Sequence, residues 1–201
     1  MGENMDRVEL KTAAKNQIKG NIGAYFVCML VTAVICGALE CIPKVGPIIA
    51  FIFVSPISLG FTHLALGMTR GEKVHVKKLF ESFNDFERSL LVNLLVAIFT
   101  FLWSLLLVVP GIIKGLSYSM SLYILADNPD MTAKEAFEES KTMMEGHKLE
   151  LFVLILSFIL WDILTVVTCG IASIYVAPYK VATFANYYNK LKNEEVSEVI
   201  E

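Results

Sequence analysis

Charged residues are scarce in this sequence, and several long stretches have none at all. They make up 18% of the 201 residues, whereas 55% are hydrophobic and the mean hydropathy is +0.60. Soluble domains usually carry about 25% charged residues. The stretch Leu90–Val109 contains only Asn93, Thr100 and Ser104 as polar residues. Because a helix crosses a bilayer with about 20 apolar residues, the composition predicts an integral membrane protein and argues against an ordinary soluble domain.

The sequence also lacks the motifs that commonly carry catalysis or cofactor binding. Its histidines, His63, His75 and His147, are scattered without an HExxH pattern, and its four cysteines have no metal-like spacing. The segment 117–121 has three serines but no GxSxG elbow. The net charge of −3 favours no nucleic-acid partner. We therefore expect no catalytic residues, no metal site and no cofactor, and we expect that the protein is not an enzyme.

The apolar stretches belong to a unit that occurs three times along the chain. Each unit is a charged amphipathic stretch followed by a hairpin of two apolar runs, and the units cover about residues 6–68, 75–126 and 132–189, before a tail at 190–201. Pro and Gly stop helices and start turns, so we expect the hairpin turns at Pro43–Pro47, Pro110-Gly111 and Thr168–Gly170. The pattern predicts an all-α fold with a single membrane domain over residues 1–201. Its six transmembrane helices form three hairpins, each preceded by a cytoplasmic interfacial amphipathic helix.

The basic residues predict the orientation of these runs. Lysine and arginine near span ends stay on the cytoplasmic side. Fifteen of the seventeen fall in the N-terminal stretch, the two long connections and the C-terminal segment from Lys180 onward, and only Lys44 and Lys114 fall at the opposite ends of the runs. We therefore expect a multi-pass protein with both termini in the cytoplasm. Cys41 and Cys169 then lie at outer turns, where they are either a disulfide, since that face is oxidising, or two packed thiols.

The charged stretches have the pattern of interfacial helices. Such a helix turns an apolar side to lipid or to the bundle and a basic side to headgroups. Thr132 and Glu135 form a capping-box pattern that starts the third one. The candidates for docking anionic headgroups or a partner protein are Lys11, Lys15, Lys19, Lys77, Lys78 and Arg88. The alternative is that these helices only anchor and space the hairpins.

Three charged residues lie within or beside the apolar runs. Asp162 lies about seven residues inside the turn at Cys169, and Lys114 lies at a similar depth in the second hairpin. An acidic group inside a membrane costs about 2.5–3.5 kcal/mol, so a partner for Asp162 is expected. We consider a Lys114–Asp162 pair, with Glu40 as a second candidate partner of Lys114. Such a pair either gates a substrate or proton path or only locks two hairpins together.

The central part of the chain is specific enough to indicate a family. Its motifs are Pro110-Gly-Ile-Ile-Lys114, Tyr118-Ser-Met120 and Tyr123-Ile-Leu-Ala-Asp-Asn-Pro129. Further matching segments are Leu10-Lys11, Ile18-Lys-Gly-Asn21, Ala133-Lys-Glu-Ala-Phe137, Met144-Glu-Gly-His-Lys148, Trp161 and Pro178-Tyr179. The chain resembles the bacterial integral-membrane family catalogued as domain-of-unknown-function family 975. The resemblance implies a six-helix protein of the bacterial cytoplasmic membrane and implies no activity. Asp162 departs from the apolar or aromatic residue that the family pattern favours.

Two functions fit these observations. The first is a non-enzymatic scaffold, assembly or envelope-protection factor, whose partners are the lipid bilayer with its anionic headgroups and a membrane or cytoplasmic protein. The second is a small transporter or channel with a polar path near Lys114 and Asp162. The three units share one direction, whereas alternating-access carriers commonly use inverted repeats. This difference favours the scaffold.

Overall fold

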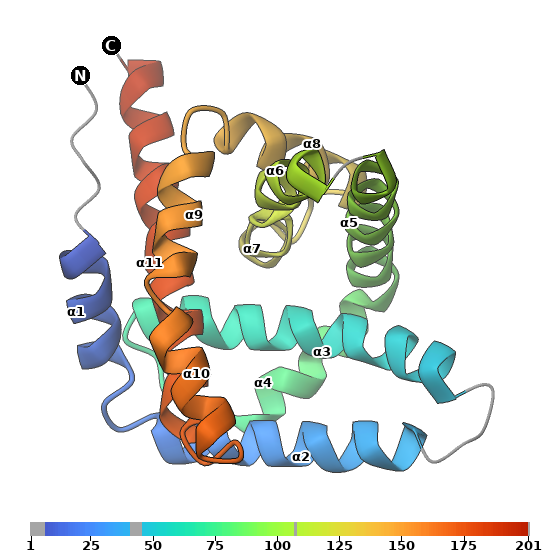
Figure 1. The fold of residues 1–201 in the computed structure, drawn as a ribbon, viewed down its shortest axis with the longest axis vertical. Coiled ribbons are helices and arrows are strands. Elements are labelled where there is room, and N and C mark those ends of the chain that lie inside the picture. Colours follow the sequence, from blue (N-terminus) through green and yellow to red (C-terminus); the bar gives the residue numbers. More distant parts are fainter. Residues whose placement is uncertain (1–6, 41–45, 107, 201) are drawn as a thin grey trace.

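The computed structural model describes residues 7–40, 46–106 and 108–200, and all regular secondary structure in these ranges is helical (Figure 1). The helices are α1 Arg7–Gln17, α2 Ile22–Glu40, α3 Gly46–Thr69, α4 Val76–Glu81, the 3-10 helix η1 Ser82–Asp85, α5 Phe86–Leu106, α6 Val108–Tyr118, α7 Ser121–Asp127, α8 Ala133–Met143, α9 Lys148–Leu156, α10 Ile159–Val167 and α11 Ser173–Ile200. The predicted all-helical fold is confirmed.

Four segments in the described part of the chain are long and apolar enough to cross a membrane. They are Ile22–Leu39, Phe51–Thr69, Val76–Leu105 and Lys148–Val167. The fourth predicted run is divided between the short helices α6 and α7. The sixth is the first part of α11, which carries Lys180 and continues as a charged helix. By length and composition, the described helices therefore support four candidate spans where the sequence predicted six.

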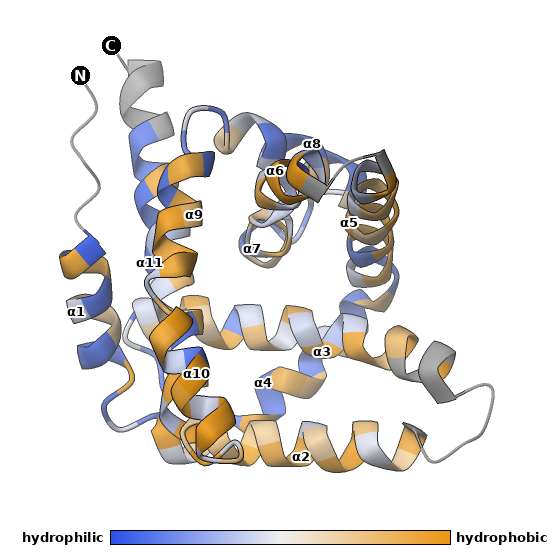
Figure 2. Cartoon of the chain, in the orientation of Figure 1, coloured by the Kyte–Doolittle hydropathy of each residue, from blue (hydrophilic) through white to orange (hydrophobic). Residues whose placement is uncertain are grey.

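The long helices do not form one parallel bundle. Figure 1 shows α2 and α3 side by side across the view, whereas α5 and the α9–α10 stretch run at a steep angle to them. The apolar colour in Figure 2 follows α2, α9 and α10, and the polar colour lies on α1, α4, α8 and part of α11. Helix α1 and helix α11, from the two ends of the described chain, pack against each other. The hairpins therefore extend from the core in different directions.

The core lies where α1, the second half of α3, α7, α8 and α11 meet. Ala14 of α1, Ala65 of α3, Ala136 of α8 and Ala185 of α11 are all fully buried there. The ends of the hairpins have the opposite character, because large apolar side chains remain on the surface, as in Leu105 with 74% exposure. Core packing therefore holds one end of the molecule together, and the hairpin ends present apolar surface.

The hairpin turns agree only in part with the predicted positions. The turn at Thr168–Gly170 is confirmed, since α10 ends at Val167 and both Cys169 and Gly170 have positive φ angles of 50° and 88°. The predicted turn at Pro110-Gly111 is wrong, because both residues lie in the first turn of α6. Pro is tolerated there because the first amide groups of a helix have no intrahelical partner. In the first hairpin, residues 41–45, which include Cys41, lie outside the described residues.

The α5–α6 hairpin packs through small residues on both helices. A Cβ atom built on Gly111 would lie 2.9 Å from the Cα atom of Ser104, so the two backbones nearly touch there. One turn further, a Cβ on Gly115 would lie 3.7 Å from Thr100 Cγ2. Small residues four apart let helix backbones approach closely. This packing places the reversal before α6, earlier in the chain than Pro110.

Candidate functional site

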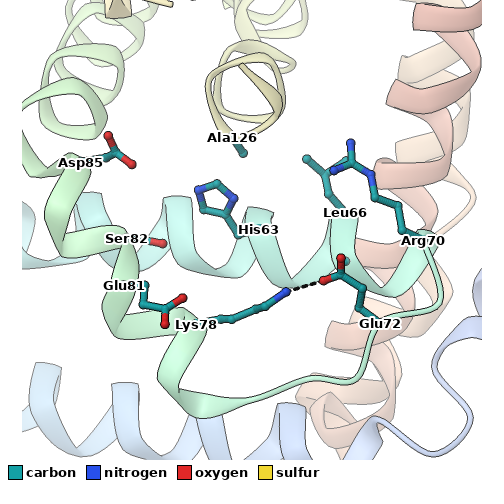
Figure 3. Close-up of a pocket in the computed structure, with 10 residues that line it drawn as sticks. His63, Leu66, Arg70, Glu72, Lys78, Glu81, Ser82, Asp85 and Ala126 are labelled. Atoms are coloured by element: carbon teal, nitrogen blue, oxygen red, sulfur yellow. Dashed lines mark hydrogen bonds and ion pairs between the residues drawn. The ribbon is translucent and has the colours of Figure 1, made fainter. Parts of the chain in front are cut away.

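A polar cavity of about 270 Å³ lies between the second half of α3, the α4–η1 segment and α7 (Figure 3). Its ionisable lining residues are His63, Arg70, Glu72, Lys78, Glu81 and Asp85. His63 comes from α3, and Figure 3 shows its ring between Asp85 and the segment that carries Arg70. The balance of acidic and basic groups suits a small polar or zwitterionic group better than a strongly charged ion.

The end of α3 shapes one wall of this cavity. Gly71 has φ +78°, and its amide donates to the carbonyl of Met68, while the Glu72 amide donates to the carbonyl of Gly67 at 2.9 Å. This is the Schellman pattern, in which a left-handed residue closes a helix. A Cβ on Gly60 would lie 2.8 Å from the Leu79 carbonyl oxygen, so α4 packs directly on the α3 backbone. The chain reversal and this close packing bring Glu72 and the α4 side chains to one side of α3.

Most charges around the cavity are paired with each other. Lys78 donates to the Glu72 carboxylate, and this hydrogen bond is the main reason that the pKa of Glu72 lies below its usual value. Asp85 accepts from Arg88 at 3.0 Å. Ser82 is only 2% exposed, and its Oγ atom has no hydrogen-bond partner among the described residues. The cavity is therefore lined mainly by charged groups that already have a partner, together with one buried hydroxyl group, that of Ser82, that has none among the described residues.

Arg70 connects the cavity to a buried carboxylate, Asp127 at the end of α7. The Asp127 side chain is 5% exposed, and it accepts hydrogen bonds from Arg70, Lys192 and the Tyr188 hydroxyl, the last at 3.2 Å. Asn189 of α11 donates to Thr69 Oγ1 at 2.9 Å beside it. Burial alone raises the pKa of Asp127, but the hydrogen bonds from Lys192 and Arg70 outweigh it and hold the pKa below its usual value. We call this set, Arg70, Asp127, Tyr188 and Lys192, the Asp127 junction.

Arg88, a predicted candidate for headgroup docking, has a side chain that is 22% exposed and that binds carbonyl groups of the protein itself. Its Nε atom donates to the Met131 carbonyl at 2.9 Å, and an Nη atom donates to the Asn128 carbonyl at 2.8 Å. A guanidinium group can bridge several acceptors because its donors form a rigid fork. Arg88 therefore holds the loop between α7 and α8 against the start of α5.

The structure gives the predicted intramembrane residues other partners. Both Asp162 oxygens accept from Lys180, at 2.8 and 3.0 Å, and Lys114 Nζ lies 5.0 Å from the Trp103 ring centre. The reason is that Asp162 and Lys180 lie on the two arms of one hairpin, on either side of the turn at Thr168–Gly170, whereas Lys114 belongs to another hairpin. Lys180 thus takes the place that we predicted for Lys114. Glu40 ends α2, and its side chain is outside the description.

The lysines among the docking candidates differ in their contacts and in their exposure to solvent. Lys11 donates to the Ser157 carbonyl at 3.2 Å, and Lys15 lies 5.9 Å from the Tyr179 ring centre. Lys19 is exposed and donates to Asn16, and the Lys77 side chain is 87% exposed. Burial, with Arg7 and Lys15 nearby, lowers the pKa of Lys11. Within the predicted set, Lys19 and Lys77 point most freely to solvent.

The Asp127 junction has only a weak signal in the sequence. The run Asp127-Asn-Pro-Asp130 directly follows the second unit, which ends near residue 126, and its sequence indicates only the end of an apolar stretch, although it carries the buried carboxylate. Its partners Arg70 and Lys192 are 57 and 65 residues away in the chain. Cys169 is exposed and is not in a disulfide. In the described residues, no group of three or more His, Cys, Asp or Glu is arranged to hold a metal ion.

Comparison with known proteins gives a family and no activity. The model of the family described as "Protein of unknown function (DUF975)" matches residues 1–114 and 105–195. No curated protein and no solved structure matches the chain. Because the matches cover nearly the whole sequence, the chain belongs to the DUF975 family.

Proposed function

We propose that this member of the DUF975 family is a non-enzymatic scaffold or assembly factor of the bacterial cytoplasmic membrane, acting in assembly or protection of the envelope. In this proposal both termini and the polar cavity face the cytoplasm, as the distribution of basic residues favours. The three helix-plus-hairpin units form one membrane domain. Its partners are lipids with anionic headgroups and a membrane or cytoplasmic protein.

One observation carries the proposal: the charged groups at one end of the protein are closed on each other and join distant segments. The Asp127 junction ties the ends of α3 and α7 to α11, and Arg88 ties α5 to the loop after α7. A catalytic group must lie within reach of a bound substrate, whereas the Asp127 carboxylate is only 5% exposed. Groups that are locked in pairs hold elements in place. The geometry therefore supports a fixed base from which the apolar hairpins extend. We call this base, formed by α1, the second half of α3, α4, α7, α8 and the later part of α11, the platform.

The transporter alternative loses the residues on which it depended. A polar path near Lys114 and Asp162 requires these side chains to meet inside the bundle. Asp162 is instead paired with Lys180 on the arm beside it, and Lys114 lies over Trp103. We therefore do not propose a transport path through these residues.

A photo-crosslinking experiment in cells tests the scaffold. A photoreactive amino acid replaces Lys77 on α4 or Lys134 on α8, both exposed on the platform side, and a third version carries it at Leu105, at an exposed hairpin end. We expect a reproducible protein adduct from at least one of the first two positions and lipid adducts from the third. Adducts are identified by mass spectrometry after purification in detergent.

Two variants then connect the adduct to the platform. Asp127→Asn weakens the junction, whereas Asp130→Asn removes the same charge at an exposed position three residues away. The adduct should be lost or much reduced with the first variant and kept with the second. If no protein is captured at either platform position, or if both variants behave alike, the scaffold proposal is wrong.

A further inference from the structure

The third hairpin, formed by α9, α10 and the start of α11, carries charged contacts halfway along its length. Asp162 pairs with Lys180 across the two arms. Lys11 of α1 donates to the Ser157 carbonyl at 3.2 Å and lies 4.4 Å from the Phe158 ring centre. Figure 1 shows α1 beside this part of the hairpin. We call Lys11, Lys15, Asp162 and Lys180 the polar belt.

The belt coincides with a break in the helix. Helix α9 ends at Leu156 and α10 begins at Ile159, and the Ser157 carbonyl between them receives the Lys11 ammonium group. The two halves also differ in packing. Leu151 and Leu154 of α9 are buried in the core, whereas none of the α10 residues is buried. The break therefore separates α9, which packs against the platform, from α10, which extends away from it.

Aromatic side chains surround the same level. Trp161, Tyr175 and Tyr179 lie with ring centres 5.9 to 6.1 Å apart. Lys15 lies 5.9 Å from the Tyr179 ring centre, and Lys180 lies 5.8 Å from that of Phe158. Tryptophan and tyrosine concentrate at the boundary between hydrocarbon and headgroups, where lysines also gather. Rings and ammonium groups together mark this level as a membrane interface.

Beyond the belt the hairpin is apolar, exposed and short. Val166 and Ile171 are 78% and 72% exposed. Asp162 lies seven positions before Cys169 at the turn, a helical rise of about 10 Å, and the helical part of the second arm, from Ser173 to Lys180, also covers seven positions, about 10 Å. The hydrocarbon core is about 30 Å thick. The part beyond the belt therefore reaches no further than about halfway across.

We propose that the third hairpin is re-entrant: it enters one leaflet from the side of the termini, turns near the bilayer centre and returns without crossing. Lys11, Lys15 and Lys180 then lie at the level of anionic phospholipid headgroups, with an excess of two positive charges over Asp162. A crossing hairpin would place all four charges near the middle of the hydrocarbon, where charged side chains are costly and rare. This inference rests on the proposed membrane location and goes beyond the scaffold role.

Spin labels on a cysteine scan of the full-length protein in vesicles of phosphatidylglycerol and phosphatidylcholine test it. Both labelled versions lack three of the native cysteines, which are replaced by alanine: Cys28, Cys36 and Cys41. The first version carries its label on Cys169. In the matched second version, Cys169→Ala is combined with Leu160→Cys, so that the label lies at an exposed site beside the belt. Oxygen and a water-soluble nickel chelate report the depth of each label. The re-entrant hairpin places Cys169 deepest and Leu160 near the headgroups. A crossing hairpin gives the reverse order, which would overturn the proposal.

Two further positions sharpen the outcome. A label at Leu149, which is 72% exposed on α9, should be accessible to the nickel chelate, because re-entry leaves α9 above the headgroups. In intact spheroplasts, Cys169 should resist a membrane-impermeant maleimide added from the outside. Labelling of Cys169 from that side contradicts re-entry. Neither readout depends on a protein partner, so failure of the scaffold proposal leaves this test intact.

The headgroup contact has its own measurement. Phosphatidylglycerol retained by the detergent-purified protein is quantified by native mass spectrometry. Lys15→Gln and Lys180→Gln should each lower the lipid affinity about fivefold, as expected for one basic residue near an anionic surface. Lys19→Gln, in the turn just after α1 and hydrogen-bonded to Asn16, is the matched control and should change it little. Equal effects of all three substitutions would contradict the assigned headgroup site.

Discussion

Replacing Asp127 by alanine tests whether the Asp127 junction holds the protein together. Its carboxylate is 5% exposed and accepts from Arg70, Lys192 and Tyr188. Removing one partner of a buried ion pair costs about 3–5 kcal/mol. Here the Arg70 and Lys192 side chains are 52% and 43% exposed, so both cations can regain water. We therefore expect a loss of about 2–3 kcal/mol in the free energy of unfolding.

The assay is thermal unfolding in detergent, followed by the reactivity of the Cys28 thiol. Cys28 is fully buried, and the other three cysteines are replaced by alanine so that it alone reports. For a chain of this size, the expected loss corresponds to a fall of about 5–10 °C in the unfolding midpoint. Asp130→Ala, at an exposed neighbour, should change the stability by less than about 0.5 kcal/mol. Equal midpoints for the two variants would refute the junction as a stabilising element.

The pH dependence of stability tests the charge state of Asp127 independently. The pKa of Asp127 is lower in the folded protein than its usual value. A group of this kind contributes stability that is present above its unfolded pKa and is lost as the pH falls through its folded pKa. The difference between the parent protein and Asp127→Ala should therefore be full at pH 7 and shrink below about pH 4. A difference that grows on acidification would contradict the assigned charge state.

Other substitutions address the remaining contacts. Gly111→Ala should force α5 and α6 apart and lower the free energy of unfolding by about 1–3 kcal/mol. Gly115→Ala should change it little, because the added Cβ atom lies at an ordinary contact distance of 3.7 Å. Thermal unfolding compares the two variants. Arg88→Lys keeps the charge but loses the fork that holds the Met131 and Asn128 carbonyls, so limited proteolysis should cut the loop after α7 several times faster. Thr132→Ala removes the observed capping box of α8 and should cost about 1 kcal/mol in thermal unfolding.

Local features of the fold could be predicted from the sequence because their causes lie within a few residues. Thr132 and Glu135 are three positions apart, and both capping hydrogen bonds form as expected, at 2.8 and 3.3 Å. The turn at Thr168–Gly170 follows from a glycine that tolerates a positive φ angle. The turn before α6 was placed too late because a proline in the first turn of a helix resembles a helix breaker in the sequence. Its position depends on how α5 and α6 pack.

The candidate site is harder to predict because it joins segments that are far apart in the chain. Nothing near Asp127 in the sequence identifies Arg70 or Lys192 as its partners. Arg88 looked like a surface charge, and only the position of the loop after α7 shows that it binds two backbone carbonyls. The partner of Asp162, in contrast, was within reach of sequence reasoning. The predicted turn at Thr168–Gly170 places residues near 176 opposite residue 162, and Lys180 lies one helical turn further along the same arm. Pairing across one hairpin requires no long-range packing.

That register also bears on how many helices cross the membrane. The segment Lys148–Val167 qualifies as a span by its mean hydropathy and length, and such an average does not record the depth at which a charge lies. Asp162 and Lys180 face each other between the turn and the platform, and Lys11 reaches the same level from α1. Three charges from three different helices meet at one depth, which is difficult to reconcile with the centre of a bilayer and natural at its surface. The first hairpin has no charged residue from Ile22 to Leu39 or from Phe51 to Thr69. Its arms are therefore the stronger candidates for helices that cross.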